Sequence, residues 1–305
     1  MFASHLQNAI ESKHSRLCVG LDPRYEWLPD EITRPFVKKY GETLKAAARA
    51  ITQFHKEVID SIHTFIPIIK PQSAYFEQYG PAGAQALLDT IAYAKQKDVF
   101  VLLDAKRGDI DSTANAYANA YLGTTCIGNL RKKAYDVDAL TINPFLGKDT
   151  LQSFITVATQ YGKGIFILVK TSNPGSGDFQ NARIDTQTVS EQIAHYINSV
   201  AQQTRKDNPY ADIGAVVGAT YPDDAKRLRI LMPNSFLLIP GYGAQGGSFD
   251  VLHHFFQKNG NGAIVNASRS VVYAYMKKKD IDFRSAIVQE CQKTISDINT
   301  AFDVK

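Results

Sequence analysis

The sequence predicts a closed (β/α)8 barrel with extra helices at its N- and C-terminal ends, and three observations lead to that fold class. Eight short β-branched runs alternate with stretches whose apolar residues recur at helical spacing. The runs are almost continuously apolar, which is typical of parallel strands covered on both faces. No Gly-x-Gly-x-x-Gly follows the first run, so an open doubly wound sheet, the main alternative, lacks its dinucleotide-binding motif.

Each predicted strand ends at a small, charged, Gly or Pro residue. The strands are expected at Leu17–Leu21, Phe65–Ile69, Val99–Leu103, Val137–Ile142, Gly164–Val169, Ile213–Val217, Ser235–Ile239 and Ala263–Val265. Apolar stripes at helical spacing run from Leu44 to Ile62 and from Leu87 to Ala94. Additional helices are expected at the N-terminus, where Phe2, Leu6 and Ile10 are so spaced, and beyond Asp280. The sequence shows no repeat, low-complexity tract or linker, so residues 1–305 are expected to form a single domain.

Composition excludes several classes of protein. An apolar share of 44% suits a chain with a sizeable core, and no apolar run is long enough to span a membrane. The formal net charge is only +4 and no basic face stands out, so nucleic acid is not an expected partner. The N-terminus lacks a signal peptide's apolar run. Cys18, Cys126 and Cys291 form no close-spaced pair, which predicts neither disulfides nor a cysteine zinc site and suits the cytoplasm.

The third predicted strand carries the most informative charges. In such barrels the reactive residues collect at the C-terminal ends of the strands. Asp104 and Lys106 lie two residues apart there, so strand alternation turns both side chains to one face, and Lys70 ends the neighbouring strand. Alternating charges keep each group ionised where burial alone would neutralise it. Together with Asp109, these residues predict a proton-transfer site, although a structural ion pair and a helix N-cap at Asp109 are the simpler alternatives.

A phosphate site is predicted at the last two strands. A glycine-rich loop, Pro240–Gly247, follows the seventh strand, and Asn266–Arg269 opens the next helix. Barrels often bind phosphate at these loops, where Arg269 would add a charge-assisted contact. Lys170 also ends a strand and could form a Schiff base, but a solvated lysine before a loop is the favoured interpretation. All seven histidines fall away from strand ends, so histidine catalysis and zinc ligation are not expected.

At these residues the chain resembles orotidine 5′-phosphate decarboxylase, and more narrowly its longer subgroup. The resemblance runs from about Leu17 to Arg269. Its specific signature is Asp104-x-Lys106-x-x-Asp109-Ile110-x-x-Thr113. Accompanying motifs follow in family order: Leu21-Asp22, Lys70-Pro71, Thr171-Ser172-Asn173-Pro174-Gly175, Gly218-Ala219-Thr220 and Pro240-Gly241-x-x-x-Gln245-Gly246-Gly247.

The resemblance implies a role for each residue of the charged group. Lys106 would donate a proton to C6 of the pyrimidine after carbon dioxide leaves, and Asp104 would lie against the substrate carboxylate. Lys70 and Asp22 would hold the ribose hydroxyls. Orotidine 5′-monophosphate would become UMP in the last step of de novo pyrimidine synthesis. The resemblance implies no cofactor and no metal.

The resemblance also assigns the remaining binding residues and a partner. Asp109 and Thr113 would reach the partner subunit's site, making the enzyme a homodimer, and Ser172 would hydrogen-bond the pyrimidine amide edge. Phosphate would be held by side chains and backbone amides of the last two loops, namely Gln245, Gly246, Gly247, Ser268 and Arg269. Ser268 departs from the family pattern, because many members have glycine there. A serine still offers its backbone N–H, so this departure is expected to have only a small effect on phosphate binding.

Three other functions remain open at this point. Magnesium-dependent sugar-phosphate enzymes of the same barrel superfamily share the Asp-x-Lys-x-x-Asp motif, but they carry a metal-binding glutamate where this chain has Lys70. A non-catalytic phosphate-binding barrel has no evident use for the charges at Lys70, Asp104 and Lys106. A Schiff-base aldolase would act through Lys170.

Overall fold

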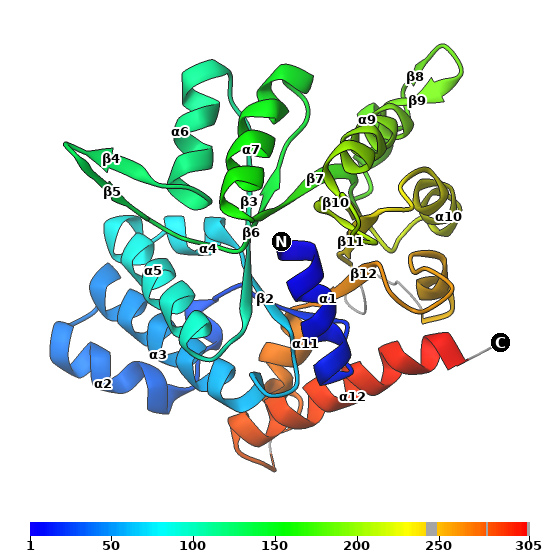
Figure 1. Cartoon of the computed structure of the whole chain (residues 1–305). Helices are drawn as coiled ribbons and strands as arrows, with labels where there is room; N and C mark the ends of the chain where they lie inside the picture. The colour runs from blue at the N-terminus through cyan, green and yellow to red at the C-terminus, as the bar shows by residue number, and fades with distance from the viewer. Residues whose placement is uncertain (242–248, 279, 304–305) are drawn as a thin grey trace.

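Eight parallel strands close into a barrel in the computed structural model, which describes residues 1–241, 249–278 and 280–303. Around the barrel the strands follow chain order as β1, β2, β3, β6, β7, β10, β11 and β12, and β12 pairs with β1 to close the ring. Figure 1 shows the helices arranged around these strands. The predicted (β/α)8 fold is therefore confirmed.

The barrel strands agree with the sequence prediction in number, and all overlap the predicted positions, although β3 continues four residues past the predicted end at Leu103 and one strand begins late. They are β1 (Leu17–Leu21), β2 (Ile68–Pro71), β3 (Phe100–Arg107), β6 (Ala139–Ile142), β7 (Gly164–Lys170), β10 (Ala211–Val217), β11 (Ser235–Ile239) and β12 (Ala263–Ala267). The strand that begins late is the second, expected at Phe65–Ile69. It begins later because the backbone N–H groups of Phe65 and Ile66 both donate to the carbonyl of Ile62, which places them in the turn after a helix.

Helices of very different lengths join the strands. They are α1 (Phe2–Lys13), α2 (Asp30–Tyr40), α3 (Leu44–Ile62), α4 (Ser73–Glu77), α5 (Gly80–Gln96), α6 (Asp111–Tyr121), α7 (Lys148–Tyr161), α8 (Ser176–Gln180), α9 (Val189–Thr204), α10 (Pro222–Leu231), α11 (Arg269–Val272) and α12 (Phe283–Asp303). Short 3-10 turns occur at η1 (Tyr25–Trp27), η2 (Phe249–His254) and η3 (Ala274–Met276). The additional terminal helices that the sequence predicted are α1 and α12.

Two small antiparallel hairpins were not predicted. One pairs β4 (Thr125–Ile127) with β5 (Leu130–Lys132), and the other pairs β8 (Arg183–Ile184) with β9 (Gln187–Thr188). Both lie outside the barrel (Figure 1). Their strands of two or three residues are too short for an alternating pattern to be visible in the sequence.

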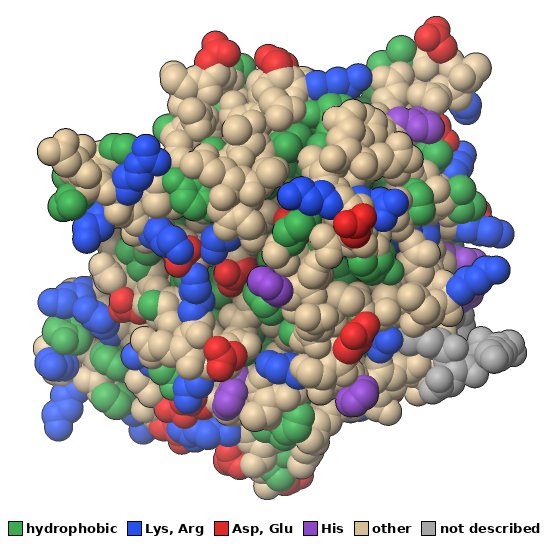
Figure 2. Space-filling model, viewed as in Figure 1, with side chains coloured by type: hydrophobic (Ala, Val, Ile, Leu, Met, Phe, Trp, Pro, Cys, Tyr) green, Lys and Arg blue, Asp and Glu red, His purple; other side chains and the backbone are tan. Residues whose placement is uncertain are grey.

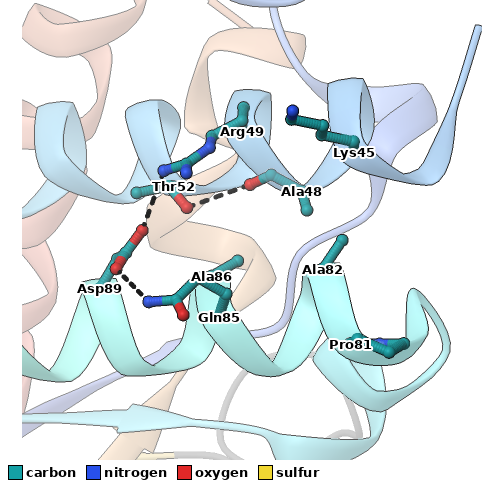
Figure 3. Close-up of a pocket in the computed structure, with 9 residues that line it drawn as sticks. All are labelled: Lys45, Ala48, Arg49, Thr52, Pro81, Ala82, Gln85, Ala86 and Asp89. Atoms are coloured by element: carbon teal, nitrogen blue, oxygen red, sulfur yellow. Dashed lines mark hydrogen bonds and ion pairs between the residues drawn. The ribbon is translucent and has the colours of Figure 1, made fainter.

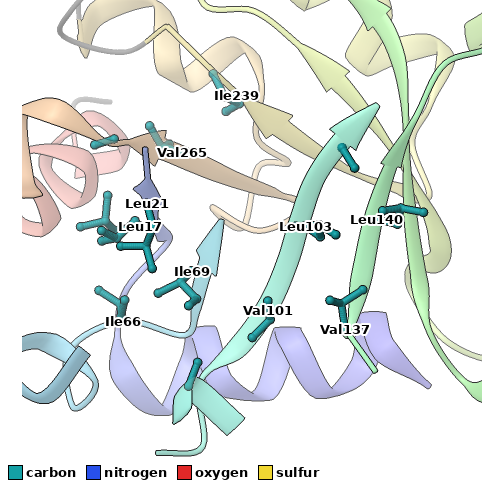
Figure 4. Close-up of a cluster of buried hydrophobic side chains, with 14 of the residues drawn as sticks. Leu17, Leu21, Ile66, Ile69, Val101, Leu103, Val137, Leu140, Ile239 and Val265 are labelled. Carbon is teal, nitrogen blue, oxygen red and sulfur yellow. The ribbon is translucent and has the colours of Figure 1, made fainter. Parts of the chain in front are cut away.

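Strand alternation divides the core into two clusters. Leu17, Leu21, Val101 and Leu103 belong to the larger cluster between the strands and the surrounding helices (Figure 4). The residues between them point into the barrel, as Leu102 does. The strands are therefore apolar on both faces, which is why they read as continuous apolar runs in the sequence.

Helix α1 covers the N-terminal end of the barrel. Phe2 is 3% exposed and makes edge-to-face contacts with Phe100 and Phe166 at centroid distances of 6.0 and 6.3 Å. Gly164 admits this ring, since a Cβ at that position would stand 2.3 Å from the nearest Phe2 carbon. Helix α1 lies in front of the strands in Figure 1. The opposite, C-terminal end of the strands is left for the polar residues.

On the face seen in Figure 2, positive and negative side chains are interspersed. None of the helices within the described ranges combines the length and the apolar character needed to cross a bilayer.

Candidate active site

The carboxylate of Asp104 is the centre of a buried polar cluster at the C-terminal end of β3. Its Oδ2 accepts hydrogen bonds from Lys70 Nζ at 2.8 Å and from Gln72 Nε2 at 3.0 Å. Its Oδ1 accepts from Lys106 Nζ at 2.6 Å and from Thr141 Oγ1 at 2.9 Å. Each oxygen thus has one cationic and one neutral donor, so the orientation of the carboxylate is fixed.

The three charged side chains differ in access to solvent. The side chains of Lys70 and Asp104 are 5% and 10% exposed, whereas that of Lys106 is 44% exposed. Lys106 therefore lies at the rim of the cluster with its ammonium turned inward to Asp104. A ligand entering from the C-terminal end of the barrel would meet Lys106 before the other two.

A bulge in β3 places Lys106. Leu103 pairs with Leu140 and Arg107 with Ile142, so three residues of β3 oppose Thr141 alone on β6. Lys106 adopts a left-handed backbone conformation with φ of 49°. Asp104 and Lys106 do share a face, as the sequence predicted, but through this bulge rather than through regular alternation.

Electrostatics keep this buried pair ionised. Burial on its own raises the pKa of Asp104, but the ammonium groups of Lys70 and Lys106 outweigh it and hold that pKa well below its usual range. Burial likewise lowers the pKa of Lys70, and the carboxylates of Asp104 and Asp22 overcome this effect and raise that pKa above its ordinary value. A carboxylate and an ammonium therefore persist at neutral pH in a site largely removed from water.

The ends of β1 and β12 contribute buried polar atoms that lack a hydrogen-bond partner among the described residues. The Oδ1 atoms of Asp22 and Asn266 are both buried and accept no hydrogen bond within the described part of the chain. Asn266 Nδ2 donates to Ser268 Oγ at 3.3 Å, and Arg269 follows as an exposed residue at the start of α11. Buried acceptors without partners are costly, so this edge of the barrel is suited to a ligand that brings donors.

The loop after β7 presents Ser172, which is half-buried. The carbonyl of Ser172 accepts from Thr220 Oγ1 at 3.2 Å, and Gly218 admits the close approach, since a Cβ there would lie 2.9 Å from Ser172 atoms. These contacts join the ends of β7 and β10 and hold Ser172 at the same end of the barrel as Lys106.

The expectation that Lys170 is a solvated lysine is wrong. Its side chain is 1% exposed, and its Nζ donates to Asn181 Oδ1 at 2.5 Å and lies 3.4 Å from Asp224 Oδ2. Val217 of β10 pairs with Lys170 directly after Val216 pairs with Leu168, so a bulge turns Lys170 outward, toward α8 and α10. Its ammonium faces the outer layer, away from the mouth that a Schiff-base mechanism would use.

Asp109 and Thr113 are not bonded to the Asp104 cluster in the described part of the chain. Asp109 is half-buried and its Oδ1 accepts the backbone N–H of Ile110 at 2.8 Å, while Thr113 is exposed on the first turn of α6. Ile110, not Asp109, occupies the N-cap position of α6. Within the described ranges, neither residue bonds to Lys70, Asp104 or Lys106. The predicted residues Gln245, Gly246 and Gly247 lie outside the described residues.

Two members of the cluster were missed by sequence reasoning. Gln72 directly follows the Lys70-Pro71 pair, and its place one strand away from Asp104 could have been recognised. Thr141 has no such signal, because it lies inside an apolar strand where threonine is common. Its importance depends on the register of β3 against β6.

A groove in the outer helical layer is separate from this site. In the described ranges no group of three or more His, Cys, Asp or Glu side chains is arranged to hold a metal ion. A groove of about 290 Å³ lies between α3 and α5, with Arg49 and Asp89 paired at 3.2 Å across it (Figure 3). It contains none of the predicted site residues and lies in the outer helical layer, away from the strand ends.

Comparison with known proteins gives a consistent result. The model of the orotidine 5′-phosphate decarboxylase / HUMPS family matches residues 15–282. The orotidine 5′-phosphate decarboxylase of Rhodopirellula baltica is 43% identical over 278 residues, which are 91% of this chain and 90% of that protein. The protein of the same name from Caldicellulosiruptor bescii is 36% identical over 300 residues, 98% of each chain.

Solved structures agree with the sequence comparison. The OMP decarboxylase of Leishmania donovani superposes with a TM-score of 0.74 at 30% identity and covers 99% of both chains. The UMP synthase of the same organism superposes with a TM-score of 0.74 at 32% identity, over 99% of this chain and 56% of that longer one.

Proposed function

Because the chain belongs to the orotidine 5′-phosphate decarboxylase / HUMPS family, we propose that it converts orotidine 5′-monophosphate into UMP and carbon dioxide, the last step of de novo pyrimidine synthesis. Homologues with 33–43% identity carry the name of this carboxy-lyase, and the chain is an enzyme of that class. Lys70 argues against the magnesium-dependent branch, because an ammonium bonded to Asp104 at 2.8 Å cannot serve as a ligand to a cation.

Lys106 is the proposed proton donor, and its fixed ammonium is the observation that carries the mechanism. When the bond from C6 to the carboxyl carbon breaks, its electron pair stays on C6 in the plane of the ring, where the π-system cannot delocalise it. An ammonium held at 2.6 Å by Asp104 stabilises that charge and then transfers a proton from Nζ to C6. The neutral amine, partly exposed at the rim, regains a proton from solvent.

The other residues of the cluster hold the substrate in place. We assign the ribose hydroxyls to Lys70 and Asp22, and the buried, unpartnered Asp22 Oδ1 supports this because it needs a donor. Asp104 is proposed to lie against the substrate carboxylate, as the resemblance implies. Since both Asp104 oxygens are fully occupied by protein donors, Asp104 does not act as a proton acceptor in the proposed reaction.

The remaining binding groups follow from the resemblance. Ser172 is proposed to hydrogen-bond the pyrimidine amide edge, and Arg269 and Ser268 to bind the phosphate. The exposed guanidinium of Arg269 has no ion-pair partner among the described residues, which supports this assignment. Gln245, Gly246 and Gly247 would complete the phosphate site. Phosphate contacts far from C6 supply binding energy that positions the pyrimidine.

A homodimer is proposed, with Asp109 and Thr113 completing the partner subunit's site. Both residues lie outside the Asp104 cluster of their own chain. Large apolar side chains are exposed beside them, since Ile110 is 54% and Phe145 is 85% exposed. Exposed apolar groups on adjacent loops are typical of an interaction surface.

The dimer can be tested by complementation. Lys106→Ala and Asp109→Ala proteins are each expected to be inactive, and mixing them after subunit exchange should restore activity, because a mixed dimer contains one site with both residues intact. Sedimentation would report the mass of the species formed. A lack of recovery in mixtures that do exchange subunits would contradict a shared site.

We also propose that residues 1–305 form one domain that works in the cytoplasm. Pairing of the last barrel strand with the first supports one domain. The cysteines Cys18, Cys126 and Cys291 are free, which supports a reducing compartment.

The decisive experiment measures decarboxylation of orotidine 5′-monophosphate in EDTA by the loss of pyrimidine absorbance. The metal-stripped chain is expected to turn over quickly, and Lys106→Ala to lose at least about 10³-fold in kcat. Turnover that appears only after magnesium is restored would point to the sugar-phosphate branch. Near-normal turnover by Lys106→Ala would show that another group protonates C6.

A further inference from the structure

We infer that Thr141 is a positioning residue of this site, whose hydroxyl ties the Asp104 carboxylate to the main chain of Lys106. The inference rests on the proposed decarboxylase function. It concerns a residue that lies on β6, opposite the bulge in β3, and is 1% exposed.

The two hydrogen bonds of the Thr141 hydroxyl fix the direction in which its O–H proton points. The backbone N–H of Lys106 donates to Thr141 Oγ1 at 2.9 Å, so this oxygen acts as the acceptor there. The hydroxyl proton is then free to be donated to Asp104 Oδ1, also at 2.9 Å. Because Thr141 is buried, water cannot easily replace either bond.

The bulge explains why a side chain has to accept the hydrogen bond from the backbone N–H of Lys106. Residues 104–106 oppose Thr141 alone, so the Lys106 N–H has lost the carbonyl that a regular ladder would offer. The left-handed backbone of Lys106 is a sparsely populated conformation for a residue with a Cβ, and it persists only where surrounding bonds hold it. The Thr141 hydroxyl is one such bond, so it sets the point from which the Lys106 side chain departs.

Gln72 provides an internal comparison. It also donates to Asp104, at 3.0 Å to Oδ2, but it makes no hydrogen bond to Lys106 in the described structure. Removing the Gln72 amide takes one donor from the carboxylate, whereas removing the Thr141 hydroxyl takes one donor from the carboxylate and the acceptor from Lys106. If Thr141 acts through Lys106, its loss must lower kcat more than the loss of Gln72.

The test compares Thr141→Val, which keeps the shape of the side chain and removes the hydroxyl, with Gln72→Leu and Thr141→Ser. Thr141→Val is expected to lower kcat about 10- to 100-fold and to leave KM and the Kd for UMP within about twofold, because the lost bonds act on the proton donor. Gln72→Leu should lower kcat less, and Thr141→Ser, which retains the hydroxyl, should stay close to the parent.

Thr52→Val is the matched control for loss of a buried hydroxyl. Thr52 is 6% exposed on α3, donates to the Ala48 carbonyl at 3.0 Å and lines the groove of Figure 3, far from the strand ends. Its kcat should equal the parent's. If Thr141→Val does not fold, Thr141→Ala also removes the hydroxyl and gives the same comparison, and a loss of kcat is again expected.

Failure of the Thr141 inference and failure of the proposed function give different results. A parent chain that decarboxylates orotidine 5′-monophosphate alongside a folded Thr141→Val protein with the parent's kcat would overturn the role of Thr141 alone. A folded parent chain without turnover would overturn the proposed function together with it. An equal loss of kcat and substrate affinity in Thr141→Val would identify Thr141 as a general structural residue and would also overturn the inference.

Discussion

Gly20 on β1 lies directly against Ser268 at the end of β12. A Cβ at position 20 would stand 1.8 Å from Ser268 Oγ and 2.8 Å from Ser268 Cβ. The serine that departs from the family pattern thus fits only because residue 20 has no side chain. Gly20→Ala is expected to displace Ser268 and to raise KM for the substrate about tenfold with little change in kcat, measured by steady-state kinetics.

A compensating change sharpens that prediction. Ser268→Gly alone should stay close to the parent in KM, because the backbone N–H remains. Combined with Gly20→Ala, it removes the two closest contacts, and the next nearest atom is Asn266 Oδ1, at 3.1 Å from the new Cβ. KM of the double variant should return most of the way to the parent value. An equal KM for Gly20→Ala and for the double variant would show that Ser268 is not the group displaced.

Lys170 is expected to matter for the Ser172 loop and not for covalent chemistry. Lys170→Met keeps an unbranched side chain, shorter by one atom, and leaves Asn181 and Asp224 without their ammonium. The free energy of unfolding should fall by about 2 kcal/mol, and KM should rise because Ser172 is less well held. Urea unfolding and kinetics measure the two effects. Asp224→Asn should act in the same direction but less, and borohydride with a carbonyl substrate should not modify Lys170.

Asp136, at the N-terminal end of the barrel, should make the free energy of unfolding depend on pH. Burial alone would raise its pKa, but the ammonium groups of Lys95, Lys163 and Lys133, paired with its carboxylate at 2.7, 3.0 and 3.0 Å, lower the pKa of Asp136 to about 2. A carboxyl whose pKa is lower in the folded than in the unfolded chain stabilises the fold above about pH 4, and this stabilisation is lost as the pH falls toward 2. Asp136→Asn should therefore lower the free energy of unfolding by about 2 kcal/mol at pH 7 and by much less near pH 2.

The matched control for this change is Asp185→Asn. Asp185 is exposed and, like Asp136, has a left-handed backbone, with φ of 55° against 51°. Asparagine is equally well tolerated at both positions, so the difference between the variants isolates the three lysines. Urea unfolding of both variants at pH 7 and pH 3 would measure this difference in the free energy of unfolding. A pH-independent loss in Asp136→Asn would mean that its charge is not the cause.

Phe2 should contribute to stability without affecting turnover. Its ring is buried against Phe100 and Phe166 at the end of the barrel opposite the candidate site. Phe2→Ala is expected to lower the free energy of unfolding by about 3–5 kcal/mol and to leave kcat unchanged at a temperature where the variant is folded. Phe179→Ala, at a residue 75% exposed, should leave stability unchanged. A large loss of kcat in folded Phe2→Ala would contradict this separation.

The site was predictable from sequence where regular strand geometry decides it. Lys70 and Asp104 end neighbouring strands, and parallel strands of a barrel bring their carboxyl ends together. Their contact at 2.8 Å therefore follows from the order of the strands. The apolar spacing of Phe2, Leu6 and Ile10 indicated a helix in the same way, although it did not show that this helix covers one end of the barrel.

Irregular geometry accounts for what the sequence did not predict. Lys170 points outward because β7 bulges against β10, and Lys106 is left-handed because β3 bulges against β6. A bulge adds one or more residues to one strand of a pair, so it depends on how two distant segments pair. Thr141 gains its role from the same pairing. Neither the composition nor the alternation pattern of one segment predicts which residues of two distant strands pair.

Helix α1 and the layer of side chains above it close the N-terminal end of the barrel. Among the described residues, Phe2, Leu6 and Ile10 are buried across this end and fill it with apolar side chains. In the proposed reaction the nucleotide enters, and both products leave, past the same rim at Lys106. The order in which carbon dioxide and UMP leave is then decided at that one end of the barrel.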